Sequence, residues 1–108
     1  MSVASSEPYD LVVIGGGPGG YSGAIRAAQY GWRVAVVEAA DRLGGVCLNW
    51  GCIPTKALLK GAEVYQLIRR AGDFGLRVEE PEVDWAAVIA RSRQVAEQLS
   101  KGVAYLLK

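Results

Sequence analysis

The sequence predicts an α/β fold, because three patterns follow one another near its start. The apolar, β-branched run at 9–14 is typical of a strand buried on both faces, as in a parallel sheet. A glycine-rich turn at 15–20 and an alanine-rich helix at 21–30 come next. A second apolar run at 32–38 is expected to be another buried strand, so residues 9–38 form one β-α-β unit.

A loop and a helix are expected after this unit. Gly31 is placed to end the first helix, and residues 39–52 are predicted to be an irregular, glycine-rich loop. The next helix has Pro54 near its first turn, covers 56–71 and has Gly72 past its end. Beyond it, residues 74–79 are predicted to be a short strand or an extended link.

A long amphipathic helix is predicted for the end of the chain. Asp84 is placed as its N-cap, and the helix runs toward Leu107. We expect its apolar stripe to face a core; the stripe comprises Trp85, Val88, Ile89, Val95, Leu99, Val103 and Leu106. Trp32 and Tyr105 are likewise expected to be core or helix-packing aromatics.

These elements predict an incomplete domain. Two strands cannot make a doubly wound sheet, and the apolar faces of three helices need a wider sheet or further layers to cover them. We therefore expect residues 1–108 to be the N-terminal part of a larger α/β domain. Its segments would be the β-α-β unit, a cysteine-containing loop at 39–56 and a helical segment at 57–108.

Composition excludes several classes of function. With 108 residues, 51% apolar and 21% charged, the chain has room for one small globular domain at most, and its net charge of +1 gives no support for binding nucleic acid or membrane. Residues 1–10 do not resemble a signal peptide, and no apolar run is long enough to span a membrane. We expect a soluble cytoplasmic protein, in which two nearby cysteines suggest redox or metal chemistry.

The glycine-rich turn fits a dinucleotide fingerprint. Gly15, Gly17 and Gly20 would permit the tight turn, the approach of a pyrophosphate and close helix–strand packing, respectively. The helix N-terminus that follows favours phosphate. Glu38, 18 residues after Gly20, is placed to accept both ribose hydroxyls of an adenosine, which disfavours NADP. The alternative is a glycine-rich turn without a ligand, and the motif does not separate FAD from NAD.

Two cysteines follow the β-α-β unit closely. Cys47 and Cys52 are separated by four residues, including Gly51, that can bring two sulfur atoms into bonding range. Cys52 precedes the predicted helix and Lys56 lies within one turn, so both would favour a thiolate at Cys52. Buried structural thiols remain possible, and a structural disulfide is disfavoured in the cytosol. The chain has no histidine, so a zinc site would be short of ligands and we expect no metal.

The run GGVCLNWGCIPTKALL at 44–59 resembles the active-site signature of class I pyridine nucleotide-disulfide oxidoreductases, and the resemblance extends over 9–108. Leu48 and Ile53 favour the members that oxidise dihydrolipoamide, because glutathione and mercuric reductases tend to have Val at both positions. Trp50 is a departure, since the family usually has a small aliphatic residue there.

The resemblance implies a role for each part of the site. The first glycine loop would bind the FAD pyrophosphate through Gly15, Gly17, Pro18 and Gly20, and Glu38 would bind the adenosine ribose. The backbone of Gly44, Gly45, Val46 and Cys47 would run along the flavin, with Lys56 near the reactive edge of its ring. Cys52 would be the charge-transfer thiol that faces the flavin, and Cys47 the interchange thiol that meets the substrate.

The resemblance also implies a reaction and partners. Dihydrolipoamide, free or on a lipoyl domain of a 2-oxoacid dehydrogenase complex, would reduce the disulfide, and electrons would pass through FAD to NAD+. NAD would bind in a domain outside this chain, and a His-Glu acid/base pair would come from the other subunit of a homodimer. These residues alone are therefore expected to be inactive. The alternatives are a truncated, non-catalytic nucleotide-binding or subunit-pairing fragment, and a related disulfide reductase.

Overall fold

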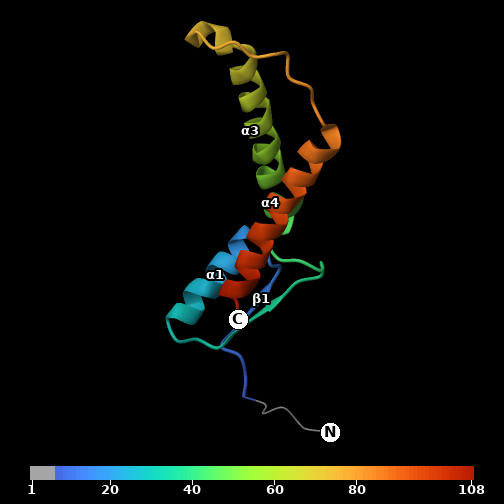
Figure 1. Cartoon of the computed structure of the whole chain (residues 1–108). Helices are drawn as coiled ribbons and strands as arrows, with labels where there is room; N and C mark the ends of the chain where they lie inside the picture. Colours follow the sequence, from blue (N-terminus) through green and yellow to red (C-terminus); the bar gives the residue numbers. More distant parts are fainter. Residues whose placement is uncertain (1–6) are drawn as a thin grey trace.

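A computed structural model describes residues 7–108 as a mixed α/β structure. A β-α-β unit lies at one end, helix α3 extends away from it, and helix α4 returns alongside α3 toward the unit (Figure 1). The elements in chain order are β1 (Leu11–Ile14), α1 (Pro18–Gln29), β2 (Val34–Val37), α2 (Gly45–Trp50), α3 (Cys52–Arg69), the 3-10 helix η1 (Ala71–Phe74) and α4 (Trp85–Leu106).

The predicted β-α-β unit is confirmed. Strands β1 and β2 pair in parallel, from Leu11 opposite Val34 to Ile14 opposite Val37. Both strands are shorter than predicted, and α1 begins earlier than predicted because Pro18 fits its first position. The expected burial on both faces is wrong within these residues: Ile14 is 88% exposed, because α1 packs on the two-stranded sheet and leaves side chains of the other face uncovered.

The predicted irregular loop at 39–52 contains a helix. Gly44 and Gly45 have φ values of 107° and 61°, which let the chain turn sharply into α2. After Gly51, helix α3 begins at Cys52, so Pro54 is the third residue of its first turn, where its missing N–H costs no intrahelical bond. The short loop at 39–44 is therefore followed by two consecutive helices.

The end of α3 differs in detail from the prediction. Gly72 lies within η1, and the left-handed glycine that ends this turn is Gly75, with φ of 74°. Residues 76–84 carry no strand, so the extended link is right and the short strand is wrong. Asp84 is confirmed as the N-cap of α4, since its Oδ1 accepts a hydrogen bond of 3.0 Å from the Ala87 N–H.

The buried side of α4 is formed mainly by small residues, and Val103 is the one member of the predicted stripe that is buried. Its buried positions are Ser92, Ala96, Ser100 and Val103. Small side chains let α4 approach α2 and α3 closely. Of the other stripe residues, Val88 and Val95 are half-buried, whereas Trp85, Ile89, Leu99 and Leu106 stay exposed in the described chain. Trp85 is 72% exposed and Tyr105 is 78% exposed, so the prediction of core aromatics is wrong here, as it is for Trp32.

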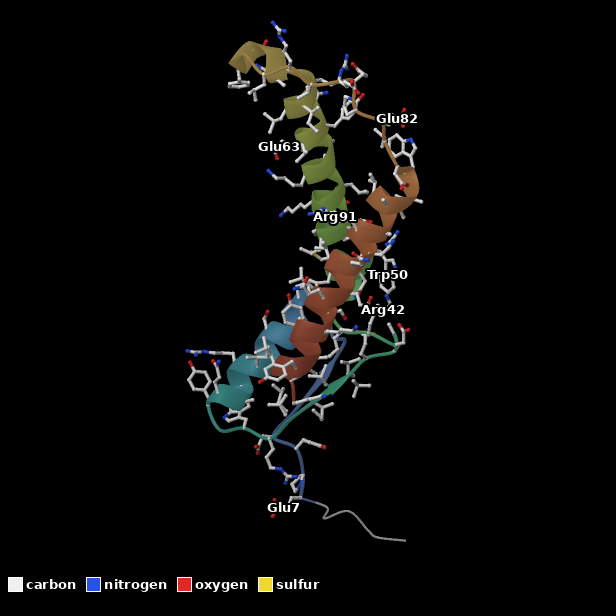
Figure 2. The ribbon with its side chains drawn as sticks, viewed as in Figure 1. Glu7, Arg42, Trp50, Glu63, Glu82 and Arg91 are labelled. Carbon is white, nitrogen blue, oxygen red and sulfur yellow. The ribbon has the colours of Figure 1, made fainter. Side chains whose placement is uncertain are left out.

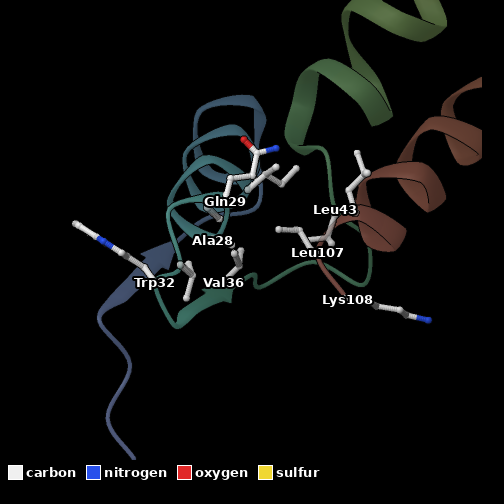
Figure 3. Close-up of a pocket in the computed structure, with 11 residues that line it drawn as sticks. Ala28, Gln29, Trp32, Val36, Leu43, Leu107 and Lys108 are labelled. Atoms are coloured by element: carbon white, nitrogen blue, oxygen red, sulfur yellow. The ribbon is translucent and has the colours of Figure 1, made fainter.

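The described chain is elongated. It measures 68 × 30 × 18 Å with a radius of gyration of 20.6 Å, whereas a compact domain of this length would have about 13 Å. The buried apolar residues of the described chain are few and mostly small: Ala24, Ala27, Leu48, Ala71, Ala96 and Val103. An open hollow of about 630 Å³ lies between α1, β2 and the end of α4, lined by residues that include Val36, Leu43 and Leu107 (Figure 3). The described chain therefore does not enclose a large core.

Candidate dinucleotide and dithiol site

The first glycine loop has the conformation that its spacing predicts. Gly15 has a φ of 101°, which favours glycine in the turn out of β1. A Cβ on Gly20 would lie only 1.8 Å from the Gly15 carbonyl oxygen, so α1 can approach the strand only without a side chain there. A Cβ on Gly17 would meet nothing closer than 3.8 Å, which leaves the backbone at Gly17 accessible to a ligand.

The N-terminus of α1 opens toward this loop. The helix has 12 residues, and its N-cap, Gly17, makes no side-chain capping bond. Pro18 at the first position has no N–H, and the other N–H groups of the first turn have no intrahelical acceptor. Free N–H donors at the positive end of a helix dipole favour a bound phosphate.

Glu38 directly follows β2, and its side chain binds the backbone of the first glycine loop. Its Oε2 accepts from the Gly16 N–H at 2.7 Å and its Oε1 from the Ala40 N–H at 2.9 Å. The bond from Ala40, followed by that from Gly16, lowers the pKa of Glu38 below 4.5. Each carboxylate oxygen keeps a second lone pair, so the ionised group can still accept from a hydroxyl.

A second glycine loop packs directly on the first. The Gly44 N–H donates to the Gly16 carbonyl at 2.8 Å. A Cβ on Gly45 would lie 2.8 Å from the Cα of Gly17, so two glycines face each other with no room for a side chain. Gly16 was not singled out from the sequence, although a Cβ there would lie 2.5 Å from the Leu43 side chain. The triple-glycine run was the only signal for it.

The two thiols lie on consecutive helices that leave the second loop. Cys47 is half-buried in α2, Cys52 is the exposed first residue of α3, and both are unpaired. Interaction with the Cys52 side chain, followed by burial, raises the pKa of Cys47 above 9.0, and the charge of Lys56 partly opposes this rise. The fold therefore brings together the two thiols and the lysine that the sequence singled out. The expected thiolate at Cys52 stays a prediction.

The sequence analysis missed the side chains that hold the second loop. Asn49 is 4% exposed, and its Nδ2 donates to the Leu43 carbonyl at 3.1 Å and to the Gly45 carbonyl at 3.0 Å. Ser100 of α4 donates to the same Leu43 carbonyl at 2.7 Å. A lone Ser100 in an amphipathic helix gives no sequence signal, because its partner lies 57 residues earlier.

The surroundings of the thiols are open. Trp50, at the end of α2, is 57% exposed, and Figure 2 shows it on the same side of α4 as Arg42. Arg42 is exposed and its guanidinium pairs with Asp41 at 3.1 Å.

Within residues 7–108, no group of three or more histidine, cysteine or acidic side chains is arranged to hold a metal. No described helix combines the length and apolar character needed to cross a bilayer.

Comparisons with known proteins agree with this geometry. The family model described as pyridine nucleotide-disulphide oxidoreductase matches residues 9–108. Dihydrolipoyl dehydrogenase of Chlorobaculum parvum is 53% identical over 108 residues, 100% of this chain and 23% of that protein. The enzymes of the same name from Zymomonas mobilis and Chlorobaculum tepidum are 54% and 57% identical, covering 95% and 93% of this chain.

These relatives are much longer than the chain, which spans 22% of the Zymomonas protein and 21% of the Chlorobaculum tepidum protein. Their similarity nevertheless covers both glycine loops and both cysteines, since the matched regions include nearly the whole chain. The chain belongs to the pyridine nucleotide-disulphide oxidoreductase family.

Proposed function

We propose that this chain is the FAD-binding and disulfide segment of an enzyme that oxidises dihydrolipoamide, and that it acts within a longer polypeptide. One observation carries the proposal: the Gly44 N–H bonds to the Gly16 carbonyl, which joins the two glycine loops. The proposed nucleotide-binding loop thereby contacts the loop that leads into the two cysteine-bearing helices, α2 and α3. Residues 9–38 would be the nucleotide unit, 39–56 the disulfide segment and 57–108 the helical support.

The residues present fit FAD. The open backbone at Gly17 and the free N–H groups after Pro18 suit a pyrophosphate, with Gly15 and Gly20 providing the turn and the close packing. The ionised Glu38 suits an adenosine ribose. The backbone of Gly44, Gly45 and Val46 would lie along the flavin, and Lys56 near the reactive edge of its ring, as the side chain whose charge also reaches Cys47.

The proposed thiol chemistry begins from a Cys47–Cys52 disulfide. A substrate thiolate attacks Cys47 Sγ, so a mixed disulfide forms and the sulfur of Cys52 leaves with the electron pair. The second substrate thiol then displaces the Cys47 sulfur, which releases lipoamide. The cysteine pair has then gained two electrons in total and is a dithiol. The Cys52 side chain and burial raise the pKa of Cys47, which favours protonation of the Cys47 sulfur once it has left. Bound FAD supplies the two-electron oxidant that restores the disulfide.

The remaining proposals concern the whole protein. NAD+ would be the final electron acceptor, bound outside these residues, and the acid/base group would also come from elsewhere, since this chain has no histidine. A lipoyl domain of a 2-oxoacid dehydrogenase complex is proposed as partner because the relatives are named dihydrolipoyl dehydrogenase. A homodimer and a cytoplasmic location are proposed from the family resemblance of the sequence alone.

The test uses the longer flavoprotein that carries this segment. We expect dihydrolipoamide to reduce NAD+ in the wild-type protein, and Cys47→Ser and Cys52→Ser each to lower kcat by at least about 10³-fold, because each removes a covalent step. FAD content, measured by absorbance, should stay equal in all three proteins. Turnover that survives Cys47→Ser would overturn the proposal.

A second candidate is a non-catalytic fragment that binds nucleotide or pairs with a full-length subunit. The elongated shape and the uncovered strand face favour it. Binding of the 108-residue chain to FAD and to a full-length subunit, each measured by calorimetry, tests this candidate, and binding to neither excludes it. A panel of disulfide substrates with the longer protein separates lipoamide from the substrates of related reductases.

A further inference from the structure

We propose that Asn49 and Ser100 are positioning residues that together clamp the second glycine loop and so set where Cys47 lies relative to the first loop. The inference deepens the proposed function and rests on it. The two side chains come from α2 and α4, and both donate to one atom, the Leu43 carbonyl oxygen, at 3.1 and 2.7 Å. That oxygen has two lone pairs, so these two donors satisfy it fully.

The burial of Asn49 argues for a specific role. Its amide donates twice, to Leu43 and Gly45, while its Oδ1 has no hydrogen-bond partner among the described residues. A buried acceptor without a donor destabilises a fold. An amide in this position therefore adds little stability as a packing residue. The Asn49 amide instead adds two hydrogen bonds to the second glycine loop, at the carbonyls of Leu43 and Gly45.

The hydrogen-bond acceptor of Ser100 is unusual for a serine within a helix, because it lies outside that helix. Such serines commonly donate to a carbonyl three or four residues earlier in their own helix. Ser92, which is also buried and lies two turns before Ser100, does this: it donates to the Ile89 carbonyl at 2.7 Å. Ser100 instead reaches across to Leu43. The two serines are thus a matched pair on one helix, and only one of them touches the loop.

The clamped atoms surround the contact between the two loops. Leu43 and Gly45 flank Gly44, whose N–H bonds to the Gly16 carbonyl, and Gly45 leads through Val46 into Cys47. Gly44 and Gly45 both have positive φ, in a region where glycine changes conformation easily. Fixing the carbonyls on either side of Gly44 therefore restricts the segment that separates the nucleotide loop from Cys47.

The first test compares Ser100→Ala with Ser92→Ala in the longer flavoprotein after FAD has been removed. One readout is hydrogen exchange of the amides at 44–47; the other is the equilibrium of the Cys47–Cys52 dithiol with oxidised and reduced glutathione. Ser100→Ala should change both by about 3- to 10-fold, the effect of one net hydrogen bond. Ser92→Ala should leave both unchanged, because its bond stays within α4. Equal behaviour of the two variants would overturn the clamp.

The second test varies the donor at position 49. Asn49→Asp keeps the size but loses the donor and should have the largest effect. Asn49→Ser can still donate to the Gly45 carbonyl, four residues earlier, and should lie between Asp and wild type. Combined with Ser100→Ala, Asn49→Ser should give a non-additive change, since both act on Leu43. Additive effects would contradict a shared clamp.

Reconstitution separates this inference from the proposed function. With FAD restored, Ser100→Ala should slow reduction of the flavin by the dithiol about 10-fold, because misplacing reacting groups by a fraction of an ångström is costly. If the flavin-free readouts shift but no variant binds FAD, the clamp stands and the proposed function fails. If FAD binds and turns over while those readouts are the same for Ser100→Ala and wild type, the clamp fails alone.

Discussion

The two ends of this molecule are built differently. Around the glycine loops, backbone atoms meet with no room for a side chain: a Cβ on Gly20 would lie 1.8 Å from the Gly15 carbonyl oxygen. Along α3 and α4, large apolar side chains such as Leu59 and Trp85 are 62% and 72% exposed. Close backbone contacts within residues 15–56, together with the bond from Ser100 to the Leu43 carbonyl, fix the geometry of the site. The far ends of the two helices gain little from burial in this chain.

The largest expected effect comes from adding a methyl group where the loop is tight. Gly20→Ala in the longer flavoprotein should lower the free energy of unfolding by about 3 kcal/mol, because the strand and α1 must move apart, and should abolish FAD retention. Gly19→Ala is the control: a Cβ there meets nothing within 4 Å, and alanine favours the helix. Urea denaturation and flavin absorbance measure both effects, and equal outcomes for the two variants would contradict the close packing.

The next effect concerns charge at the ribose site. Glu38→Gln should weaken FAD binding about tenfold, since hydrogen bonds to an ionised acceptor are the stronger kind. The folded-state pKa of Glu38 is lowered from 4.5. Its stabilising contribution is therefore present above pH 4.5 and is lost as pH falls through the lower folded-state pKa.

Unfolding followed by denaturant at several acidic pH values checks this sign. Wild type should lose stability on acidification more steeply than Glu38→Gln. Glu63→Gln, at an exposed pair with Lys60, should behave as wild type. Parallel pH profiles for Glu38→Gln and wild type would refute the assignment.

A smaller effect is expected at the start of α4. Asp84→Ala removes the acceptor for the Ala87 N–H and should cost about 1 kcal/mol of unfolding free energy. Asp84→Asn keeps a capping oxygen and should cost much less. Thermal unfolding followed by circular dichroism can rank the stabilities of the three proteins. An Asp84→Asn protein that is less stable than Asp84→Ala would be inconsistent with a cap.

The smallest effect is predicted at the exposed helices. In the 108-residue chain, Trp85→Ser should change the unfolding free energy by no more than about 0.5 kcal/mol, as at other surface positions. The same substitution in the longer protein tests whether residues outside this chain cover Trp85. A loss of several kcal/mol there would mean that other residues cover this face; a small loss in both would mean that it stays exposed.

These two ends also differ in what the sequence could predict. The β-α-β unit and the Asp84 cap follow from local rules, because each depends on residues close in sequence or on a fixed spacing. The bond from Ser100 to the Leu43 carbonyl could not be predicted, since neither residue carries a local signal for a contact 57 positions away.

The errors in the sequence-based predictions have two causes. The whole apolar stripe of α4 was expected to be buried, yet only its Val103 is, and the helix otherwise packs through Ser92, Ala96 and Ser100. Periodicity shows which face is apolar, but it does not show whether that face has a partner within the same residues. The helix α2 was missed for a different reason: two glycines suggested a loop, whereas their positive φ values turn the chain into a helix.

The most direct test of the central claim, that a dinucleotide site and a dithiol form one centre, is the visible spectrum of the longer flavoprotein during anaerobic two-electron reduction. A long-wavelength thiolate-to-flavin band is predicted in the wild type. In Cys47→Ser, which has no disulfide to reduce, the band should be present before reduction and disappear as the flavin itself is reduced. Cys52→Ser should show no band at any stage, with FAD bound in all three proteins. A wild-type protein that holds FAD yet shows no such band, or a band that survives Cys52→Ser, would contradict the account.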